Sequence, residues 1–432
     1  MTLREDTLTI IYDTLYGENF SADLIGEKRN NYDTKDFNLL QELVLGTLRH
    51  SLYLEYVLKS RSKIPFRKID KYVLNILKMA FYQVLFLDRV PDYAIVNESV
   101  NLAKKYANRG AAGFVNGVLR RFLRDGSKIE VKEKDPIKYL SIMYSVNEEL
   151  TKYFVDRYGY EFTEEMFKSL LLKTDVTVRV NTLKATVEEF ESIMTNEGFK
   201  YRKGPLSKTG YIIDNPNGLF TSKAFKEGYF YVQNESSILV GEALDPKEGE
   251  KVLDMCAAPG GKTTHISALM SNTGEVWALD VNDKKVSKIK ENAARLGVKN
   301  IKTFVQDGTV YNEAFKESFD KVLVDAPCSA LGLMRRYPEI KLKKSIEDII
   351  EISNIQLNII LNAAKYLKNG GKLVYSTCTI TSEENEKVID EFLKQNKNFK
   401  IEKFEDKNFL RIFPQEYNTD GFTIWKLIKC NI

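Results

Sequence analysis

Two cysteines each stand just after a run that has the composition of a buried β-strand. Residues 325–328 read Asp-Ala-Pro-Cys and residues 376–378 read Ser-Thr-Cys, so the two thiols belong to Cys328 and Cys378. Carbon 5 of a pyrimidine becomes nucleophilic once a thiolate adds at carbon 6, so an enzyme that methylates that carbon needs a cysteine. A second thiol or base then helps to remove the carbon-5 proton and expel the enzyme. The pair therefore predicts methyl transfer to a pyrimidine.

A glycine turn upstream of both cysteines has the features of a cofactor site. Residues 254–262 read Asp-Met-Cys-Ala-Ala-Pro-Gly-Gly-Lys, between a predicted strand and a predicted helix. Gly260 and Gly261 let the backbone approach a ligand closely, and the helix that begins at Lys262 presents free N–H groups to a carboxylate. A phosphate-binding loop needs glycine where Cys256 stands, which excludes binding of a nucleoside triphosphate.

Three aspartates follow later strands of the same region. Asp280 lies about 20 residues past the turn, where dinucleotide folds keep an acceptor for ribose hydroxyls. Asp307 can accept from an adenine amino group, and Asp325 can bond the ring nitrogen of a cytosine as the thiol adds. A nicotinamide dehydrogenase shares the Asp280 argument but leaves the two cysteines unexplained. The predicted cofactor-binding residues are Cys256, Ala257, Ala258, Pro259, Gly260, Gly261, Lys262, Asp280, Asp307 and Asp325.

The C-terminal part, 233–432, alternates strand and helix and predicts an α/β domain of Rossmann-like type. Such alternation builds a parallel sheet with helices on both faces, and ligands bind outside the carboxyl ends of its strands. Every candidate residue of the site lies at such an end. The predicted strands are 251–254, 275–280, 301–305, 321–325, 372–376 and 421–427.

Residues 136–232 predict a small α+β module that binds RNA. Alternating hydrophobic residues favour a strand over 176–180, and the predicted helix over 187–194 precedes two further strands. Within the first strand Arg179 and Asn181 could reach a ligand. Polar residues at alternate positions more often form the solvent-facing side of a half-buried strand, and we expect that here.

Residues 1–130 predict an all-helical domain, because apolar residues recur there at helical spacing. A polar, charged segment, 125–136, ends in proline and is interpreted as a linker. The formal charge of +4 is only a weak indication of an anionic partner. Clustered cations say more, and those that follow Cys328 predict contact with RNA phosphate. The predicted RNA-binding residues are Arg335, Arg336, Lys341, Arg120 and Arg121, and two more lysines, Lys343 and Lys344, complete the cluster that follows Cys328.

Several classes of protein are disfavoured. Four cysteines without a CxxC pair and only two histidines lack the ligand spacing of a zinc site, and no metal is expected. So few cysteines in so large a chain also argue against a disulfide framework. The N-terminus carries acidic residues where a signal peptide is basic, and no apolar run approaches the ~20 residues that span a bilayer. We expect a cytoplasmic, soluble monomer without membrane contact.

The motifs together resemble the NOL1/NOP2/Sun family of RNA cytosine-5 methyltransferases over about residues 176–427. The matching segments are the glycine turn, Asp325–Cys328, Ser376–Cys378 and 383–386. The order of residues over 89–91, 96–100 and 114–121 resembles the NusB family, whose fold is a helical RNA-binding bundle. Two departures are Asn234, where aspartate is expected, and Leu342, where tryptophan is common.

The resemblance implies S-adenosylmethionine as cofactor, Cys378 as nucleophile, Cys328 as the group that assists release, and Asp325 beside them. The residues alone do not decide which of the two cysteines is the nucleophile and which assists release. DNA cytosine-5 methyltransferases attack through a Pro-Cys cysteine, which here is Cys328, whereas the Thr-Cys context of Cys378 agrees with RNA enzymes. The NusB-like start implies a 16S rRNA, or a small-subunit precursor, as substrate.

We therefore predict a multidomain chain: an all-α NusB-like bundle over 1–130, a small α+β (RRM-like) module over 136–232, and an α/β Rossmann-like class I methyltransferase domain over 233–432. The predicted function is methylation of a 16S rRNA cytosine at carbon 5. Two alternatives are a cytosine-C5 methyltransferase of another RNA such as tRNA, and a non-catalytic NusB-type RNA-binding assembly factor. The intact cysteine pair and glycine turn argue against the second.

Overall fold

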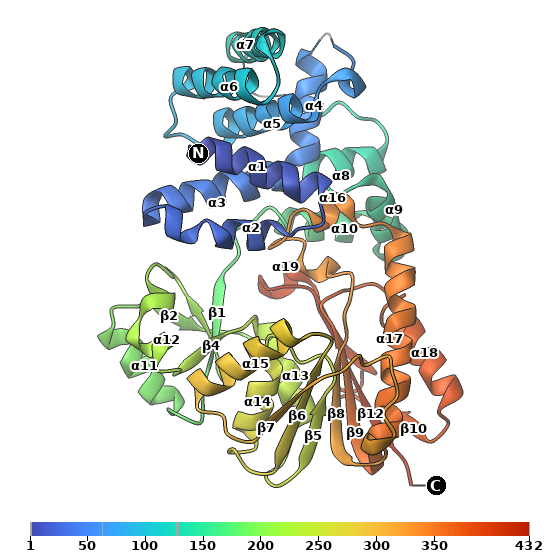
Figure 1. Cartoon of the computed structure of the whole chain (residues 1–432). Helices are drawn as coiled ribbons and strands as arrows, with labels where there is room; N and C mark the ends of the chain where they lie inside the picture. Colours follow the sequence, from blue (N-terminus) through green and yellow to red (C-terminus); the bar gives the residue numbers. More distant parts are fainter. Residues whose placement is uncertain (1, 63, 127–128, 432) are drawn as a thin grey trace. The chain divides into compact units, whose positions relative to one another are not determined.

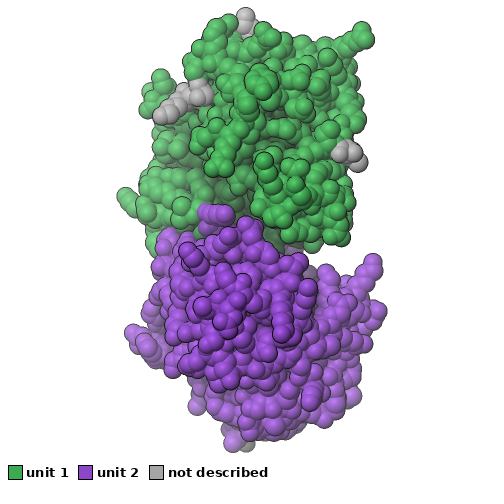
Figure 2. Space-filling model, turned by 90° about the vertical axis from the view of Figure 1, so that its left-hand side faces the viewer, with its two compact units in different colours: residues 1–172, 334–345 green, residues 173–333, 346–432 purple. Residues whose placement is uncertain are grey.

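The computed structural model describes residues 2–62, 64–126 and 129–431, and divides the chain into two compact units. Unit 1 comprises residues 1–172 and 334–345, and unit 2 comprises 173–333 and 346–432 (Figure 2). Residues 127 and 128 of the predicted linker lie outside the described residues. Each unit has its own hydrophobic core.

The described residues of unit 1 form helices and no strand, as predicted for residues 1–130 (Figure 1). Side chains cap several helix starts: Thr2 and Glu5 form a capping box at α1, while Asp33 and Asp70 cap α3 and α5. The core is formed mainly by α5, α6 and α7 packed on α1 and α4. The helices are α1 (Leu3–Tyr16), α2 (Ser21–Glu27), α3 (Thr34–Arg49), α4 (Ser51–Arg61), α5 (Lys71–Phe86), α6 (Asp92–Tyr106), α7 (Arg109–Arg124), α8 (Pro136–Tyr144), α9 (Glu148–Tyr158), α10 (Tyr160–Ser169) and α16 (Ile340–Lys343).

The boundary predicted near residue 136 differs from the structure. Residues 136–169 form α8, α9 and α10 and belong to unit 1, so the sheet module begins only at Val176. Apolar residues of α8 and α9, including Leu140 and Phe154, are fully buried. Apolar residues do recur at helical spacing in 136–169. The boundary was nevertheless predicted at 136, because the residues that follow have a mixed helix and strand pattern.

The structure corrects the RNA contact that was predicted for the segment after Cys328. Residues 334–345 belong to unit 1, where Lys341 is fully buried and its ammonium donates to the carbonyls of Arg49 (2.9 Å) and Tyr144 (2.6 Å). Arg335 is 1% exposed and donates to the carbonyl of Leu172. Cations inside a folded unit cannot reach phosphate. Arg335 and Lys341 instead donate hydrogen bonds to backbone carbonyls inside unit 1.

The remaining cations of this cluster are less deeply placed. Lys343 is exposed but donates to the carbonyls of Thr14 (3.0 Å) and Gly17 (2.6 Å), at the end of α1. Arg336 is half-buried within the same segment. Within unit 1, Glu339 accepts from the backbone and hydroxyl of Ser21. The segment is therefore a packed part of unit 1.

Unit 2 begins with a four-stranded antiparallel sheet in the order β2-β3-β1-β4. Its core is formed by alternate residues of the strands, such as Val178 and Tyr211, against α11. This confirms the predicted α+β class of the module; β2 was not predicted. The elements are β1 (Val176–Val180), α11 (Val187–Asn196), β2 (Tyr201–Lys203), β3 (Gly210–Ile213), α12 (Lys223–Lys226) and β4 (Phe230–Val232).

The larger sheet of unit 2 has the order β10-β12-β9-β8-β5-β6-β7, with β11 paired to β12. Strands β5 to β9 are parallel and β12 is antiparallel. This confirms the Rossmann-like prediction; the edge strands β10 and β11 were not predicted. The strands are β5 (Lys251–Asp254), β6 (Glu275–Asp280), β7 (Ile301–Val305), β8 (Phe319–Asp325), β9 (Leu367–Thr377), β10 (Phe399–Ile401), β11 (Phe409–Ile412) and β12 (Phe422–Lys429).

Helices cover both faces of this sheet (Figure 1). Alternate strand residues point to opposite sides: Leu253 and Tyr375 pack with α17 and α18, whereas Val252 and Val374 pack with α13 and α14. The helices are α13 (Glu235–Leu244), α14 (Gly261–Leu269), α15 (Asp283–Leu296), α17 (Ile346–Tyr366), α18 (Glu386–Gln395) and α19 (Pro414–Tyr417).

Replacing Lys341 with methionine tests its structural role. The variant leaves two carbonyls without a donor, so the first unfolding transition in urea should lose about 1–3 kcal/mol. Lys35→Met, at an exposed residue of α3, is the control and should change little. A variant of unchanged stability whose RNA binding loses salt dependence would restore the phosphate role.

Candidate active site

The site is built where β5, β8 and β9 end side by side. Parallel pairing aligns Asp254 of β5 with Leu323 of β8, and Asp325 of β8 with Ser376 of β9. Because the strands are neighbours and parallel, the loops that leave their carboxyl ends share one edge of the sheet. Those loops carry Cys328, Cys378 and the glycine turn.

The two predicted catalytic thiols lie together. The sulfur atoms of Cys328 and Cys378 are 2.9 Å apart, and neither cysteine is in a disulfide. The hydrogen bond to Cys378, and then burial, raise the pKa of the Cys328 thiol well above its usual range. The backbone also joins the two loops, because the N–H of Gly332 donates to the carbonyl of Cys378.

Asp325 lies between the thiols and the glycine turn. One carboxylate oxygen bonds the ammonium of Lys262 at 2.6 Å and the other accepts from the hydroxyl of Ser376 at 2.8 Å. Burial opposes the charge of Lys262, but the Asp325 carboxylate outweighs it and raises the lysine pKa. Lys262, predicted to hold cofactor, is thus also the cation that fixes Asp325.

The glycine turn forms a cradle that side chains would fill. Gly260 has a φ of +99°, and a Cβ on Gly261 would lie 2.8 Å from the ring of Tyr231. Residue 254 is 1% exposed: its carboxylate accepts from Thr263, and its other oxygen, Oδ1, is buried without a partner. Burial raises the pKa of Asp254 to about 7. A carboxylate with one unpartnered oxygen, near the start of α14 where no side chain caps the N–H groups, fits a ligand with both ammonium and carboxylate groups, as S-adenosylmethionine has.

The other predicted cofactor residues lie around this cradle. The carboxylate of Asp280 accepts from the N–H of Ala258 (3.0 Å) and Val281 (2.8 Å) and lies 3.5 Å from the ammonium of Lys285. Asp307 is exposed and accepts from Thr309, which forms a local turn. Asp280 therefore orients the cofactor turn as well as presenting a carboxylate to the site.

The turn residues between Cys256 and Gly260 have distinct surroundings. The N–H of Ala257 donates to the carbonyl of Leu279 in β6, and the carbonyl of Pro259 accepts from Asn292 of α15. Burial, and then the nearby carboxylates, raise the pKa of the Cys256 thiol well above its usual range. The thiol is therefore protonated at neutral pH, and Cys256 acts in the cradle as an uncharged side chain.

Arg179 and Asn181 contradict the expectation of a solvent-facing strand side. Both are buried, and the guanidinium of Arg179 donates to the carbonyl of Gly261 (2.6 Å), to Thr264 (3.2 Å) and to the amide oxygen of Gln233. Arg179 therefore joins β1 to the first turn of α14. Strand alternation alone gave no signal, because the element that covers this face comes from a distant part of the sequence.

The departure at Asn234 has a local explanation. Its side-chain oxygen caps α13 by accepting from the N–H and hydroxyl of Ser236, and it also accepts from Thr419. Asparagine and aspartate are both good N-cap residues, so the substitution preserves this function. Leu342, the second departure, lies in α16, which belongs to unit 1.

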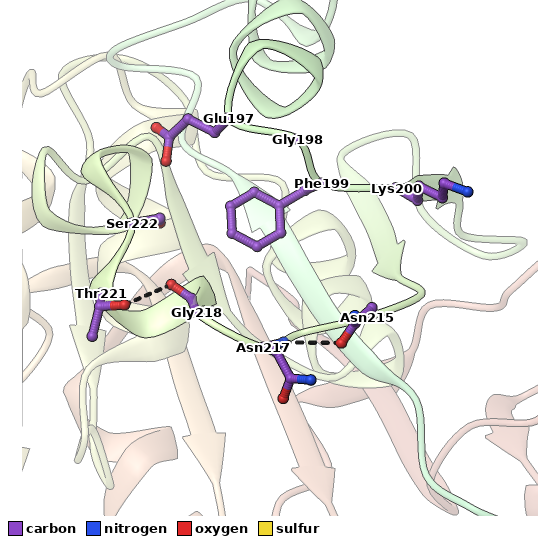
Figure 3. A pocket seen from close by; sticks show the side chains of 9 residues that line it. All are labelled: Glu197, Gly198, Phe199, Lys200, Asn215, Asn217, Gly218, Thr221 and Ser222. Carbon is purple, nitrogen blue, oxygen red and sulfur yellow. Dashed lines mark hydrogen bonds between the residues drawn. The ribbon is translucent and has the colours of Figure 1, made fainter. Parts of the chain in front are cut away.

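A cavity of about 620 Å³ lies in the four-stranded module, separate from the thiols (Figure 3). Phe199, Asn215 and Asn217 line it together with Glu197. The Glu197 carboxylate is already used, because it accepts from the N–H groups of Lys223 and Ala224 at the start of α12. The cavity contains none of the predicted site residues.

The two remaining predicted RNA-binding residues lie on α7 of unit 1. Arg120 is exposed, donates to Asn116 at 3.0 Å, and lines a cavity of about 400 Å³ with Tyr93, whose side chain is 79% exposed. Arg121 is partly exposed and pairs with Asp125. This surface offers cations and an aromatic ring, which are the groups that bind phosphate and unpaired bases.

Two further findings concern the described part of the chain only. None of its helices is long and apolar enough to cross a membrane. Within residues 2–62, 64–126 and 129–431, no group of three histidine, cysteine, aspartate or glutamate side chains is placed to hold a metal ion.

Family comparisons divide the chain in three. Residues 1–124 match the NusB family, residues 149–219 match the ferredoxin-like domain of RsmF/B-like methyltransferases, and residues 241–428 match the family of 16S rRNA methyltransferase RsmB/F. The last match spans the glycine turn and both thiols. S-adenosylmethionine is the methyl donor, and the chain's cradle fits it.

Individual relatives and solved structures agree with these family matches. The probable ribosomal RNA small subunit methyltransferase B of Bacillus subtilis is 39% identical over 415 residues, which cover 93% of this chain and 92% of that protein. The crystal structure of PH0851 is 27% identical, with a TM-score of 0.83 over 99% of both chains. That of NSun6 from Pyrococcus horikoshii with SFG is 27% identical, with a TM-score of 0.59 over 66% of this chain and 99% of the other.

Fold, thiol-bearing strand ends, cofactor cradle and similarity along nearly the whole sequence thus agree. The chain belongs to the ribosomal RNA small subunit methyltransferase B family, the members of which depend on S-adenosylmethionine.

Proposed function

We propose that the chain methylates carbon 5 of a cytosine in 16S rRNA through a covalent adduct between Cys378 and carbon 6. The observation that carries the proposal is the 2.9 Å separation of the Cys328 and Cys378 sulfurs beside Asp325. Methylation at nitrogen or oxygen needs no thiol. Two thiols at one base supply both a nucleophile and a second group for the release step.

The sequence context of the thiols favours Cys378 as the nucleophile, because Thr-Cys agrees with the RNA cytosine-5 methyltransferases that the chain resembles. A thiolate attacks, and the pKa of Cys328 is raised by the hydrogen bond to Cys378 and by burial, which keeps Cys328 protonated while both thiols are free. Once Cys378 is bonded to carbon 6, Cys328 loses that partner. Its proton can then leave, so the same residue can act later as a base.

Asp325 and Lys262 supply the electrostatic part. When the sulfur of Cys378 bonds to carbon 6, the C5–C6 electron pair forms a C4–C5 double bond. The electron pair of the C4–N3 double bond moves onto ring nitrogen 3, which gains a proton. That proton balances the one lost by the thiol. In this proposal the carboxylate of Asp325, which bonds Lys262 at 2.6 Å, accepts a hydrogen bond from the protonated nitrogen.

S-adenosylmethionine, when bound, supplies an electrophilic methyl group on a sulfonium. The glycine turn and Asp280 would hold it so that its methyl group could pass to carbon 5, with the thioether as leaving group and the C4–N3 double bond restored. Cys328 then removes the carbon-5 proton, the C5–C6 double bond re-forms, and the bond from carbon 6 to Cys378 breaks. Nitrogen 3 returns its proton to the sulfur of Cys378, which leaves a neutral methylated cytosine and two free thiols. The one proton released overall is the proton that Cys328 lost before it acted as a base.

The substrate and the location remain parts of this proposal. The NusB-type helical unit with Arg120 and Tyr93 on one surface supports an rRNA, or a small-subunit precursor, over tRNA. The non-catalytic alternative leaves the adjacent thiols without a role. We retain the expectation of a cytoplasmic monomer without metal.

The roles of the thiols can be separated on a denaturing gel with RNA and cofactor. Cys378→Ala should abolish both turnover and any covalent protein–RNA band, because it lacks the attacking sulfur. Cys328→Ala should attack and methylate yet release slowly, so that the covalent band accumulates. A band from Cys378→Ala with none from Cys328→Ala would reverse the assignment.

The cofactor assignment predicts that Asp280→Ala weakens S-adenosylmethionine binding. The variant removes an acceptor for the ribose hydroxyls and the bond to the N–H of Ala258, and hydrogen bonds to charged groups predict a loss of roughly 10- to 100-fold. Titration calorimetry measures it, with Asp283→Ala on α15 as the control. An unchanged dissociation constant for Asp280→Ala would remove Asp280 from the site.

The RNA surface predicts a change in salt dependence. Replacing Arg120 and Arg121 with alanine should weaken RNA binding and reduce the slope of log K against log salt by about 0.7–0.9 for each phosphate that the variant no longer neutralises. Binding is measured by fluorescence anisotropy from 50 to 200 mM salt, a range over which the effect is roughly linear. Lys35→Ala serves as control. An unaltered slope would make α7 a structural helix only.

A further inference from the structure

We infer that Glu384 is a positioning residue that holds the two thiol-bearing loops at their working separation. The kinetic consequence rests on the proposed function, whereas the geometric one does not. Glu384 follows β9, within the segment 383–386 that was matched as a motif without a role. It touches neither sulfur through a hydrogen bond, so its effect passes through neighbouring residues.

On the Cys328 side, Glu384 binds the residue next to the thiol. Carboxylate oxygen Oε1 accepts from the backbone N–H of Ser329 at 2.7 Å, and Oε2 accepts from the Ser329 hydroxyl at 2.5 Å. Two bonds to one residue fix both its position and its orientation. Gln356 extends the contact, because its amide donates to Glu384 at 3.1 Å and to the carbonyl of Pro327 at 2.9 Å.

On the Cys378 side, Glu384 binds the segment that leaves β9. Its Oε2 accepts from the hydroxyl of Thr381 at 2.7 Å, and the hydroxyls of Ser329 and Thr379 lie 3.1 Å apart. The hydroxyl of Tyr375, inside β9, donates to the backbone carbonyl of Glu384 at 2.6 Å. The carboxylate of Glu384 thereby connects Ser329, which follows Cys328, with Thr381, three residues after Cys378, and its backbone carbonyl connects the same segment to β9.

The burial of the Glu384 carboxylate indicates that it is needed to fix the positions of the two loops. Glu384 is fully buried, and among the described residues it forms no ion pair, so four neutral donors satisfy it. Burying a charge without a cation is unfavourable for stability, and apolar residues could fill the same volume. Bonds to a charged acceptor are short and directional, which suits a role in holding two loops.

The alternative is that Glu384 contributes only to folding. A positioning role changes the distance between the sulfurs, so it changes how readily they join. Diamide, an azo oxidant, takes two electrons and two protons from the pair and becomes the hydrazine as the Cys328–Cys378 disulfide forms. Peptide mass spectrometry of the linked fragments reports that rate in the full chain, without RNA or cofactor.

In Glu384→Ala, disulfide closure should slow by at least about 10-fold, because losing the shared acceptor frees the two loops. Single-turnover formation of the RNA adduct should fall by roughly 10- to 100-fold, since misplacement of a reacting group by about 1 Å has this effect. The dissociation constant for S-adenosylmethionine should stay within about twofold, because the cradle is formed by other residues.

Matched variants separate charge from shape. Glu383→Ala removes the adjacent carboxylate, which pairs with Lys387, and should leave the closure rate unchanged. Glu384→Gln should restore closure to within about threefold, because its oxygen still accepts from Ser329 N–H and the two hydroxyls can rotate to accept from its amide. If Glu384→Ala fails to fold, Thr381→Val, which removes only the contact on the Cys378 side, replaces it.

The outcomes are distinct. Slower closure with retained cofactor binding and rescue by glutamine supports the positioning role. A parallel loss of melting temperature, cofactor binding and adduct rate with an unchanged closure rate would overturn it, as would an unchanged closure rate alone. Slower closure in a protein whose wild type forms no RNA adduct would contradict the proposed function while leaving the positioning role intact.

Discussion

The parallel pairing of β8 with β9 is the constraint on which the site depends. Its register places Asp325 opposite Ser376, so the loops that follow the two strands leave the sheet at the same level. Because side chains alternate along each strand, a slip by one residue would move every side chain of that strand to the opposite face of the sheet, against the wrong set of helices. The register that fills the core with Val324 and Tyr375 is therefore the one that brings the two thiols together.

The same sheet positions the cofactor cradle. β5 pairs with β8 on one side and β6 on the other, so the glycine turn after Asp254 and the carboxylate of Asp280 meet at one edge. Lys262, on the first turn of α14, reaches back to Asp325. A single cation thereby connects the helix that follows the glycine turn with the acid at the end of β8, so the two loops are held in one arrangement.

Buried charged groups hold the segments between these elements. Arg179 donates to the backbone of the cofactor turn, Lys341 donates to two carbonyls in unit 1, and Glu384 accepts from four neutral donors. Each satisfies polar backbone or hydroxyl groups that irregular loops leave unpaired. Such residues cost desolvation, and they persist where loops must be fixed in place rather than merely covered.

The sequence by itself determined the class of each region and most of the chemistry. Helical periodicity, strand–helix alternation and the motifs around Gly260, Cys328 and Cys378 predict the helical region, the parallel sheet and the methyl donor, because these signals are local. Only the tertiary structure decided which cations are buried and which carboxylates hold loops. Lys341, Arg179 and Glu384 acquire their roles from partners far away in the sequence, and no local pattern encodes such contacts.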